Sequence, residues 1–399
     1  MSAGPADLAA SGLHKAFGPH HVLTGLDLKV AAGTMTAVLG PSGSGKTTLL
    51  RILAGFERPD RGSVTISGVT VDDDRRHVPA DRRRIGYVSQ EGSLFPHLTV
   101  AANVGFGLPR RQRRGRRVSD LLDAVALTGL ARRYPHELSG GQQQRAALAR
   151  ALAVTPRVML LDEPFASLDA NLRASVRADV RAILIEAATT AILVTHDQDE
   201  ALSTADHVAV IRDGTIAQCA TPEDLYDHPV DAGLARFIGD ANLIEGVSRH
   251  GRADTPLGTL AVRDGLPAAP GPVTVLIRPE QLAVRPGPDG PGTRGQVIST
   301  SFHGHDTVIR VSPGDQAIPS PLVVRVCGNP RLVPGSTVTL TIREPVCAWP
   351  SPAAGQHSPQ DDPGDGEQRQ GMNAGHGDGQ AGEQHPADGA DRDARSSAV

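Results

Sequence analysis

Cysteine is scarce in this sequence. Only Cys219, Cys327 and Cys347 occur among 399 residues, far apart and without a CxxC pair. This spacing argues against a disulfide framework and against a cysteine-based zinc site, and it fits a reducing compartment. Lysine is also rare, since only Lys15, Lys29 and Lys46 occur.

Long apolar runs are missing as well. No window of 18 apolar residues occurs, so we expect no segment that spans a bilayer, and any membrane role would need a partner chain. The N-terminus "MSAGPADLAASGLHKAF" has no basic start followed by an apolar run, so we expect no signal peptide. The formal net charge is −4, which argues against nucleic-acid binding by charge alone.

The first part of the chain alternates short apolar segments with helical patterns. We expect strands at 34–40, 84–90, 157–164, 190–197 and 207–214, and the third and fourth are apolar runs of the kind buried in a parallel sheet. This alternation predicts an α/β domain over residues 1–238. A mostly helical stretch at about 91–153 lies between two of the strands and is predicted to be an inserted subdomain.

Two further segments follow. Residues 239–350 contain short strand patterns between Pro/Gly turns, which predict a small all-β domain of barrel type. Residues 351–399 are rich in Gly, Gln, Asp and Pro with almost no apolar residues. Such a composition buries too little surface to offset the entropy of ordering, so it predicts a disordered low-complexity tail.

The turn "GPSGSGKT" at 40–47 follows a predicted strand and precedes a predicted helix. It fits the P-loop pattern G-x-x-x-x-G-K-[ST], in which backbone N–H groups and a helix N-terminus hold the phosphates of a nucleotide. Lys46 is expected to hold the β- and γ-phosphates, and Thr47 to ligate Mg²⁺. We therefore predict an ATP and Mg²⁺ site formed by Gly40, Pro41, Ser42, Gly43, Ser44, Gly45, Lys46, Thr47 and Thr48.

Polar side chains follow three of the predicted strands. The apolar run "VMLL" ends in Asp162, which suits Mg²⁺ coordination, and Glu163, which is placed to accept a proton from water. Taken alone, this pair would be better explained as a charged strand end before Pro164. His196 and Gln90 also follow strands, at the sheet edge where open α/β sheets bind ligands, although each signal is weak individually.

A second glycine-rich turn, "LSGGQ" at 138–142, opens another predicted helix. Ser139 can cap that helix, and Gly140 and Gly141 admit a close phosphate at its N-terminus. Because the nucleotide of the chain itself is assigned to Lys46, this turn is expected to serve the nucleotide of another copy. Two chains arranged head-to-tail would then bury two ATP molecules between them.

These motifs, in this order, resemble the ATP-hydrolysing subunits of ABC transporters over residues 12–238. The resemblance implies a P-loop NTPase with a RecA-like core. It also implies that Phe17 stacks on adenine, that Glu163 polarises the lytic water, and that His196 contacts the γ-phosphate. Gln90 would act in catalysis, ligate Mg²⁺ together with Thr47 and Asp162, and link the site to the membrane subunits. The nucleotide of the other copy would be held by Ser139, Gly140, Gly141 and Gln142.

The resemblance also implies partners and a place in the cell. We expect a homodimer, two transmembrane permease subunits and, indirectly, an extracytoplasmic solute-binding protein, with no nucleic acid. The chain would lie peripherally on the cytoplasmic face of the cell membrane. The β domain, with "LIRPEQ" at 276–281, is similar to the OB-like TOBE domain of a group of importers.

The resemblance also bears on the cargo. The segment "SQEGSLFPHLTVAANVGFGL" at 89–108 is most similar to ferric-iron importers. Spermidine/putrescine, thiamine, sulfate or another small solute are alternatives for the same machine. A protein of a different class, a soluble ABC-type ATPase of DNA repair or translation, is a further alternative. The single ATPase core and the small β domain of this chain favour the importer over it.

Overall fold

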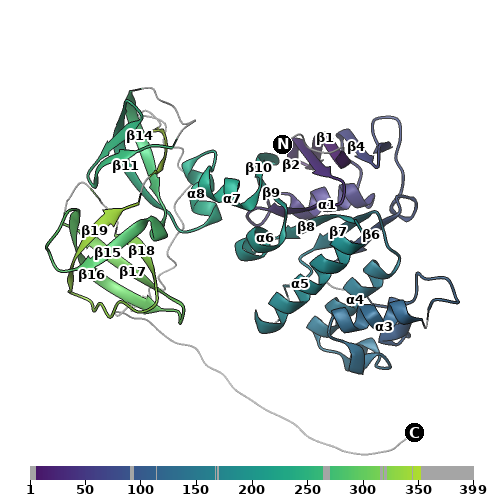
Figure 1. Ribbon diagram of the computed structural model, residues 1–399. Coiled ribbons are helices and arrows are strands. Elements are labelled where there is room, and N and C mark those ends of the chain that lie inside the picture. The colour runs from purple at the N-terminus through teal and green to yellow at the C-terminus, as the bar shows by residue number, and fades with distance from the viewer. Residues whose placement is uncertain are drawn as a thin grey trace, which may run out of the picture. The chain divides into compact units, whose positions relative to one another are not determined.

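A computed structural model describes residues 6–89, 94–113, 115–166, 168, 170–263, 270–314, 318, 321–343 and 345–351. Gln90 and the predicted tail beyond Ser351 lie outside these residues. The described residues form an α/β part and a β-rich region that follows it in the chain (Figure 1).

A six-stranded sheet forms the centre of the α/β part, in the order β10-β9-β3-β8-β7-β6. Its first five strands in the chain are parallel, and β10 pairs antiparallel with β9 at one edge. Each of the five segments predicted as strands contains one of these strands. The bounds are β3 Met35–Leu39, β6 Ile85–Val88, β7 Val158–Asp162, β8 Thr190–Thr195, β9 His207–Arg212 and β10 Thr215–Ala220.

Both faces of this sheet are covered, as its apolar strands require. Alternate residues point to opposite faces, so Val158 and Leu160 of β7 pack on one side and Met159 and Leu161 on the other. The first side packs on α1 and an antiparallel sheet, and the second on the remaining helices of the α/β part. The helices flanking the sheet are α1 Lys46–Ala54, α5 Ala170–Glu186 and α6 Gln198–Thr204.

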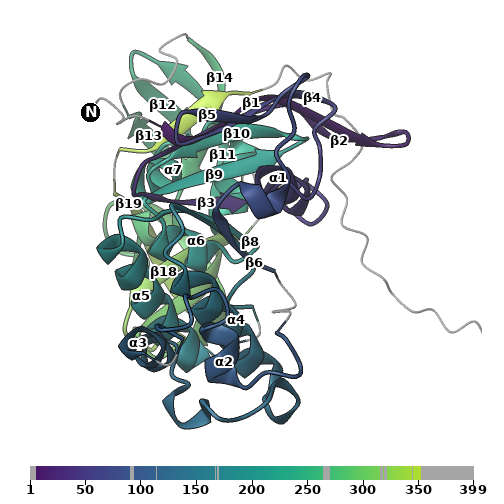
Figure 2. The same cartoon turned by 90° about the vertical axis from the view of Figure 1, so that its right-hand side faces the viewer.

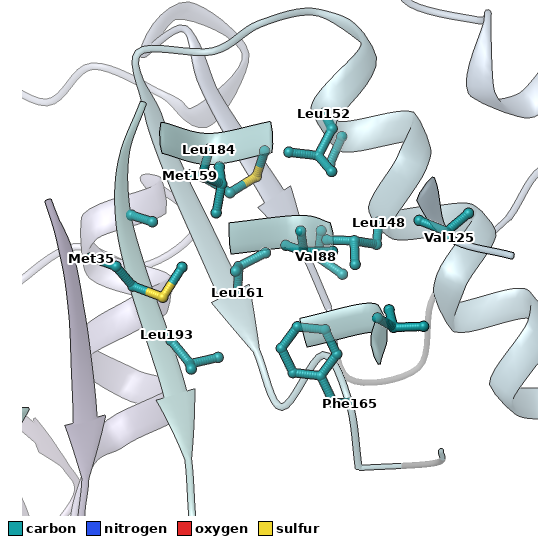
Figure 3. Close-up of a cluster of buried hydrophobic side chains, with 14 of the residues drawn as sticks. Met35, Val88, Val125, Leu148, Leu152, Met159, Leu161, Phe165, Leu184 and Leu193 are labelled. Carbon is teal, nitrogen blue, oxygen red and sulfur yellow. The ribbon is translucent and has the colours of Figure 1, made fainter. Parts of the chain in front are cut away.

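The helical insertion lies between β6 and β7. It contains α2 Val100–Val104, α3 Arg116–Ala124 and α4 Gly140–Ala153, with short 3-10 helices at Thr128–Leu130 and Pro135–Glu137. Figure 2 shows α2, α3 and α4 grouped at one end of the α/β part. Leu148 and Leu152 of α4 belong to the buried cluster that also holds Val88 and Leu161 (Figure 3). This packing fixes α4 against the ends of β6 and β7.

The N-terminal segment forms an antiparallel sheet that the sequence patterns did not predict. Its order is β2-β1-β4-β5. The pairing of β1 with β2 carries four register shifts, which interrupt the alternation of apolar and polar residues on which strand prediction depends. The bounds are β1 Ala6–Phe17, β2 His20–Ala31, β4 Arg61–Ile66 and β5 Val69–Asp72, followed by a 3-10 helix at Ala80–Arg82.

A buried ion pair ties this antiparallel sheet to α1. The Arg83 guanidinium donates to Asp72 Oδ2 over 2.5 Å, and both side chains are fully buried. Arg83 also donates to the carbonyl oxygens of Ile52 and Leu53 at the C-terminal end of α1, over 2.7 and 3.0 Å. Arg83 therefore supplies side-chain donors to carbonyls in the last turn of the helix, one of which, the Ile52 oxygen, also accepts from Gly55 N over 3.1 Å.

We expect Arg83→Met to destabilise the chain by about 3–5 kcal/mol, because it leaves the Asp72 carboxylate buried without its cation. Arg82→Met is the matched control, since the side chain of Arg82 is 78% exposed. Urea unfolding of the two variants beside the wild type would measure the difference. Equal unfolding midpoints for both variants would contradict a structural role for the ion pair.

The β-rich region, Asn242–Pro350, is built from two five-stranded sheets that share one apolar core. Strands β11, β12, β13, β14 and β20 form one sheet, and β15, β16, β17, β18 and β19 form the other. This arrangement agrees with the small all-β domain predicted from the turns. The bounds are β11 Asn242–Arg249, β12 Arg252–Thr255, β13 Gly258–Ala261, β14 Gly271–Ile277, β15 Leu282–Pro286, β16 Thr293–Phe302, β17 Asp306–Pro313, β18 Leu322–Cys327, β19 Thr337–Ile342 and β20 Cys347–Pro350, with a 3-10 helix at Pro279–Gln281.

Two short helices, α7 Pro222–Asp227 and α8 Ala232–Ile238, connect the α/β part to the β-rich region. Arg278, which is 4% exposed, donates to the carbonyl oxygens of Ala235 and Tyr226, and its guanidinium lies 4.0 Å from the centre of the Tyr226 ring. The Trp349 indole donates to the carbonyl oxygen of Pro229 over 3.1 Å. Helices α7 and α8 thus pack directly on β14 and β20.

None of the helices in the described part of the chain combines the length and the apolar character needed to cross a membrane.

Candidate nucleotide site

The loop between β3 and α1 is shaped by two of its glycines. A Cβ atom on Gly40 would lie 2.6 Å from the Ile211 carbonyl oxygen, far inside van der Waals contact. Gly45 has a φ of +100°, in the left-handed region that favours glycine, and a Cβ there would lie 2.9 Å from Leu23 Cδ2. Side chains at these positions would push the loop away from its neighbours.

Lys46 closes this loop on itself. Its buried Nζ donates to the carbonyl oxygens of Gly40 and Pro41 over 2.7 and 2.8 Å. Burial lowers the pKa of the ammonium group, and the carboxylates of Glu163 and Asp162 oppose that shift. The positive charge of Lys46 is therefore held inside the loop, within the influence of both acids.

Two further features of the loop fit an anionic ligand. The Ser44 hydroxyl is buried and has no hydrogen-bond partner among the described residues. Helix α1 begins after Gly45, and no side chain among the described residues caps its N-terminus. Its first N–H groups can therefore donate to a ligand. Pro41, Ser42, Gly43 and Thr47 are exposed, and Thr48 is half-buried. The loop thus meets the requirements of phosphate binding.

The two predicted acids lie where β7 ends, beside the end of β8. Asp162 is the last residue of β7, and burial followed by the charge of Glu163 raises the pKa of its carboxyl group. Glu163 Oε1 lies 3.0 Å from His196 Nδ1, just beyond β8. The structure therefore brings Glu163 and His196 together, as expected for residues at the carboxyl ends of neighbouring parallel strands.

Two residues that the sequence did not single out also contact these acids. The Tyr87 hydroxyl lies 3.4 Å from Asp162 Oδ2, and burial followed by that carboxylate raises the pKa of Tyr87 to about 12. The side-chain amide of Gln144 donates to the carbonyl oxygen of Glu163 over 2.8 Å. Tyr87 follows a recognisable pattern, since it belongs to a predicted strand, whereas Gln144 is one of three consecutive glutamines.

The second glycine-rich turn forms the N-terminus of α4. The Ser139 hydroxyl accepts from Gln142 N, and Gln142 Oε1 accepts from Ser139 N, over 3.3 and 3.0 Å, which is a capping box. Ser139 and Gly140 are exposed, and a Cβ atom on Gly140 would meet no atom within 4 Å. These capping bonds remain within the turn, so its outer surface is open to an anion from outside the chain.

Phe17 is 48% exposed at the end of β1, and Lys15 Nζ lies 5.1 Å from the centre of its ring. An aromatic ring left this open can stack on a planar ligand. Gln90, the remaining predicted site residue, lies outside the described residues.

The fold and this loop define a P-loop NTPase, and comparison with known proteins identifies its family. Residues 23–166 match the ABC transporter family model, and residues 275–349 match the TOBE domain model. The chain belongs to the ABC transporter family, as a subunit that binds and hydrolyses ATP to drive transport.

Three curated relatives share nearly half of their residues with this chain. The Fe(3+) ions import ATP-binding protein FbpC 1 of Rhodococcus jostii is 47% identical over 86% of this chain and 99% of its own length. The proteins called Fe(3+) ions import ATP-binding protein FbpC from Serratia marcescens and Pseudomonas fluorescens are 48% and 49% identical. They align over 84% and 82% of this chain and over 96% and 94% of their own lengths.

Proposed function

We propose that this chain is the ATPase of a ferric-iron importer and acts at the cytoplasmic face of the cell membrane. The contact between Glu163 and His196, at the sheet edge where the P-loop opens, carries the ATPase part of the proposal. The printed names of the relatives, each an Fe(3+) ions import protein, support the cargo. The domain limits 1–238, 239–350 and 351–399 are part of the same proposal.

The chain's own residues suggest the chemistry. Lys46 would exchange its bonds to Gly40 and Pro41 for bonds to the β- and γ-phosphates, which are stronger acceptors. Glu163 would accept the proton of the attacking water, with its carboxylate oriented by His196. Thr47, Asp162 and Gln90 would hold Mg²⁺, which would neutralise charge on the phosphates when bound. The uncapped start of α1 would add N–H donors.

The exposed turn at Ser139 supports a site shared between two copies. In this proposal, the nucleotide on Lys46 of one chain is completed by Ser139, Gly140, Gly141 and Gln142 of a second. The open space around Gly140 is consistent with a phosphate at this helix N-terminus. Permease subunits would couple to the helical insertion, and a solute-binding protein would deliver the cargo outside the membrane.

The cargo can be tested in cells that lack this chain. We would measure uptake of labelled ferric iron after complementation with the wild type or with Lys46→Ala. Restoration by the wild type alone is the expected result. Wild-type iron uptake in the uncomplemented cells would remove iron as the cargo, and spermidine/putrescine, thiamine and sulfate would then be tested in the same cells.

We expect Phe17→Ala to raise the KM for ATP about tenfold, since an aromatic stacking contact contributes about 0.5–1.5 kcal/mol beyond its buried area. Phe17→Tyr keeps the ring and should keep the KM. Steady-state ATP hydrolysis by the three purified proteins provides the comparison. An unchanged KM for Phe17→Ala would mean that the adenine does not stack on Phe17.

A further inference from the structure

Gln144 connects helix α4 to the backbone of Glu163. It lies in the second turn of α4 and is only 3% exposed. Its Nε2 donates to the backbone carbonyl oxygen of Glu163 over 2.8 Å, although the two residues belong to different elements. The contact is to the backbone of Glu163, so it acts on the direction in which that side chain leaves the chain.

The backbone of Glu163 needs such support. Its φ is +47°, in the left-handed region that residues with a Cβ rarely occupy. Its N–H donates to the Val194 carbonyl oxygen over 2.9 Å, and its carbonyl also accepts from Ala166 N over 3.3 Å. The bond from Gln144 is therefore one of several that keep Glu163 in a strained conformation, and it is the one that comes from α4.

Helix α4 begins at the turn that contains Ser139. Gln144 follows Ser139 by five positions, which corresponds to about 7.5 Å along a helix. Further along the helix, Leu148 and Leu152 are held in the buried cluster of Figure 3. A short and firmly packed segment thus connects an exposed anion site at one end to the backbone of Glu163.

We propose that Gln144 is a positioning residue that holds Glu163 in place. Through this contact, binding of a nucleotide at the Ser139 turn affects the position of Glu163. The inference rests on the proposed function, in which Ser139 receives the nucleotide of the partner copy and Glu163 acts on the chain's own nucleotide. Gln144 then couples the two ATP sites of the dimer. Binding of the partner copy's nucleotide at Ser139 stabilises the position of the Glu163 carboxylate, which acts on the chain's own nucleotide.

The test is Gln144→Met, which keeps the length of the side chain and removes its N–H donors. We expect kcat for ATP hydrolysis by the full-length chain to fall about 10- to 100-fold, because small misplacements of a reacting group cost about that much. The KM for ATP should change less than about threefold, since Lys46 and Phe17 are untouched. The Hill coefficient for ATP should fall toward one.

Gln143→Met is the matched control. Gln143 lies next in the same helix, but its amide donates to the carbonyl oxygens of Pro135 and Leu138, within the helical insertion. The Gln143→Met substitution removes the same kind of side-chain amide without changing the contact to Glu163. The kcat of this variant should therefore stay near that of the wild type. Equal losses of kcat in the two variants would overturn the proposal and assign both glutamines to the stability of α4.

A double variant separates positioning from a general defect. In a Glu163→Gln background, Gln144→Met should cause no further loss of the residual hydrolysis, because the positioning role that we assign to Gln144 is exerted through the Glu163 carboxylate. A further loss as large as in the wild-type background would overturn the inference. If Glu163→Gln alone left hydrolysis unchanged, the proposed role of Glu163 would fail. Normal hydrolysis by Gln144→Met beside a slow Glu163→Gln protein would reject only the role of Gln144.

Discussion

Replacing Glu163 by glutamine should slow ATP hydrolysis by about 10²- to 10⁴-fold, the usual contribution of a positioned general base. The amide has the size of the carboxylate and can still meet His196 Nδ1, which lies 3.0 Å from Glu163 Oε1. It cannot accept a proton from water at neutral pH. ATP should bind normally, and the protein should accumulate as a closed dimer, measured by single-turnover hydrolysis and size-exclusion chromatography.

Glu186→Gln supplies the control for this experiment. Glu186 is exposed at the end of α5, so the substitution makes the same change of charge away from the predicted site. Its hydrolysis rate should equal that of the wild type. Wild-type turnover by the Glu163→Gln protein would show that the proton is accepted elsewhere.

Lys46→Ala should abolish measurable ATP hydrolysis and weaken ATP binding by about 10- to 100-fold, since hydrogen bonds to charged groups contribute about 1.5–3 kcal/mol each. The Nζ atom that now binds Gly40 and Pro41 is the only ammonium group in the described part of the loop. Fluorescence titration with a labelled nucleotide would measure the affinity.

Lys29→Ala is the matched control, because Lys29 is an exposed residue of β2 and one of only three lysines. Its affinity for ATP should be unchanged. An equal loss of affinity in both variants would point to the net charge of the chain. Retained binding by Lys46→Ala alone would reject the assignment of Lys46 to the phosphates.

The central sheet could be predicted from the sequence because buried parallel strands are written as apolar runs. In β7, all five residues are buried, so the apolar run predicts a strand without any need for alternation between apolar and polar residues. Strand β1 differs, since Gly12 and neighbouring positions coincide with irregular pairing to β2. Alternation of apolar and polar residues cannot predict such a strand, because its pairing with β2 is irregular.

The site shows the same limit. The loop at 40–47 and the turn at 138–142 are continuous segments, so their chemistry was predicted from residue types and spacing. The roles of their residues stay predictions until the variants are measured. The bond from Gln144 to Glu163 joins residues 19 positions apart, through the packing of a helix on a strand end. Its amide is indistinguishable in the sequence from those of Gln142 and Gln143.

The contacts of Arg278 and Trp349 bear on how this chain could be divided. Both side chains donate to carbonyl oxygens of the segment 226–235, and Trp349, Leu276 and Cys347 pack on Ala235. A fragment that stops at residue 238 would expose this apolar surface and lose those donors. We therefore expect such a fragment to be poorly soluble. In a chimera of two related chains, a crossover placed before α7 would take α7, α8 and the strands on which they pack from the same parent.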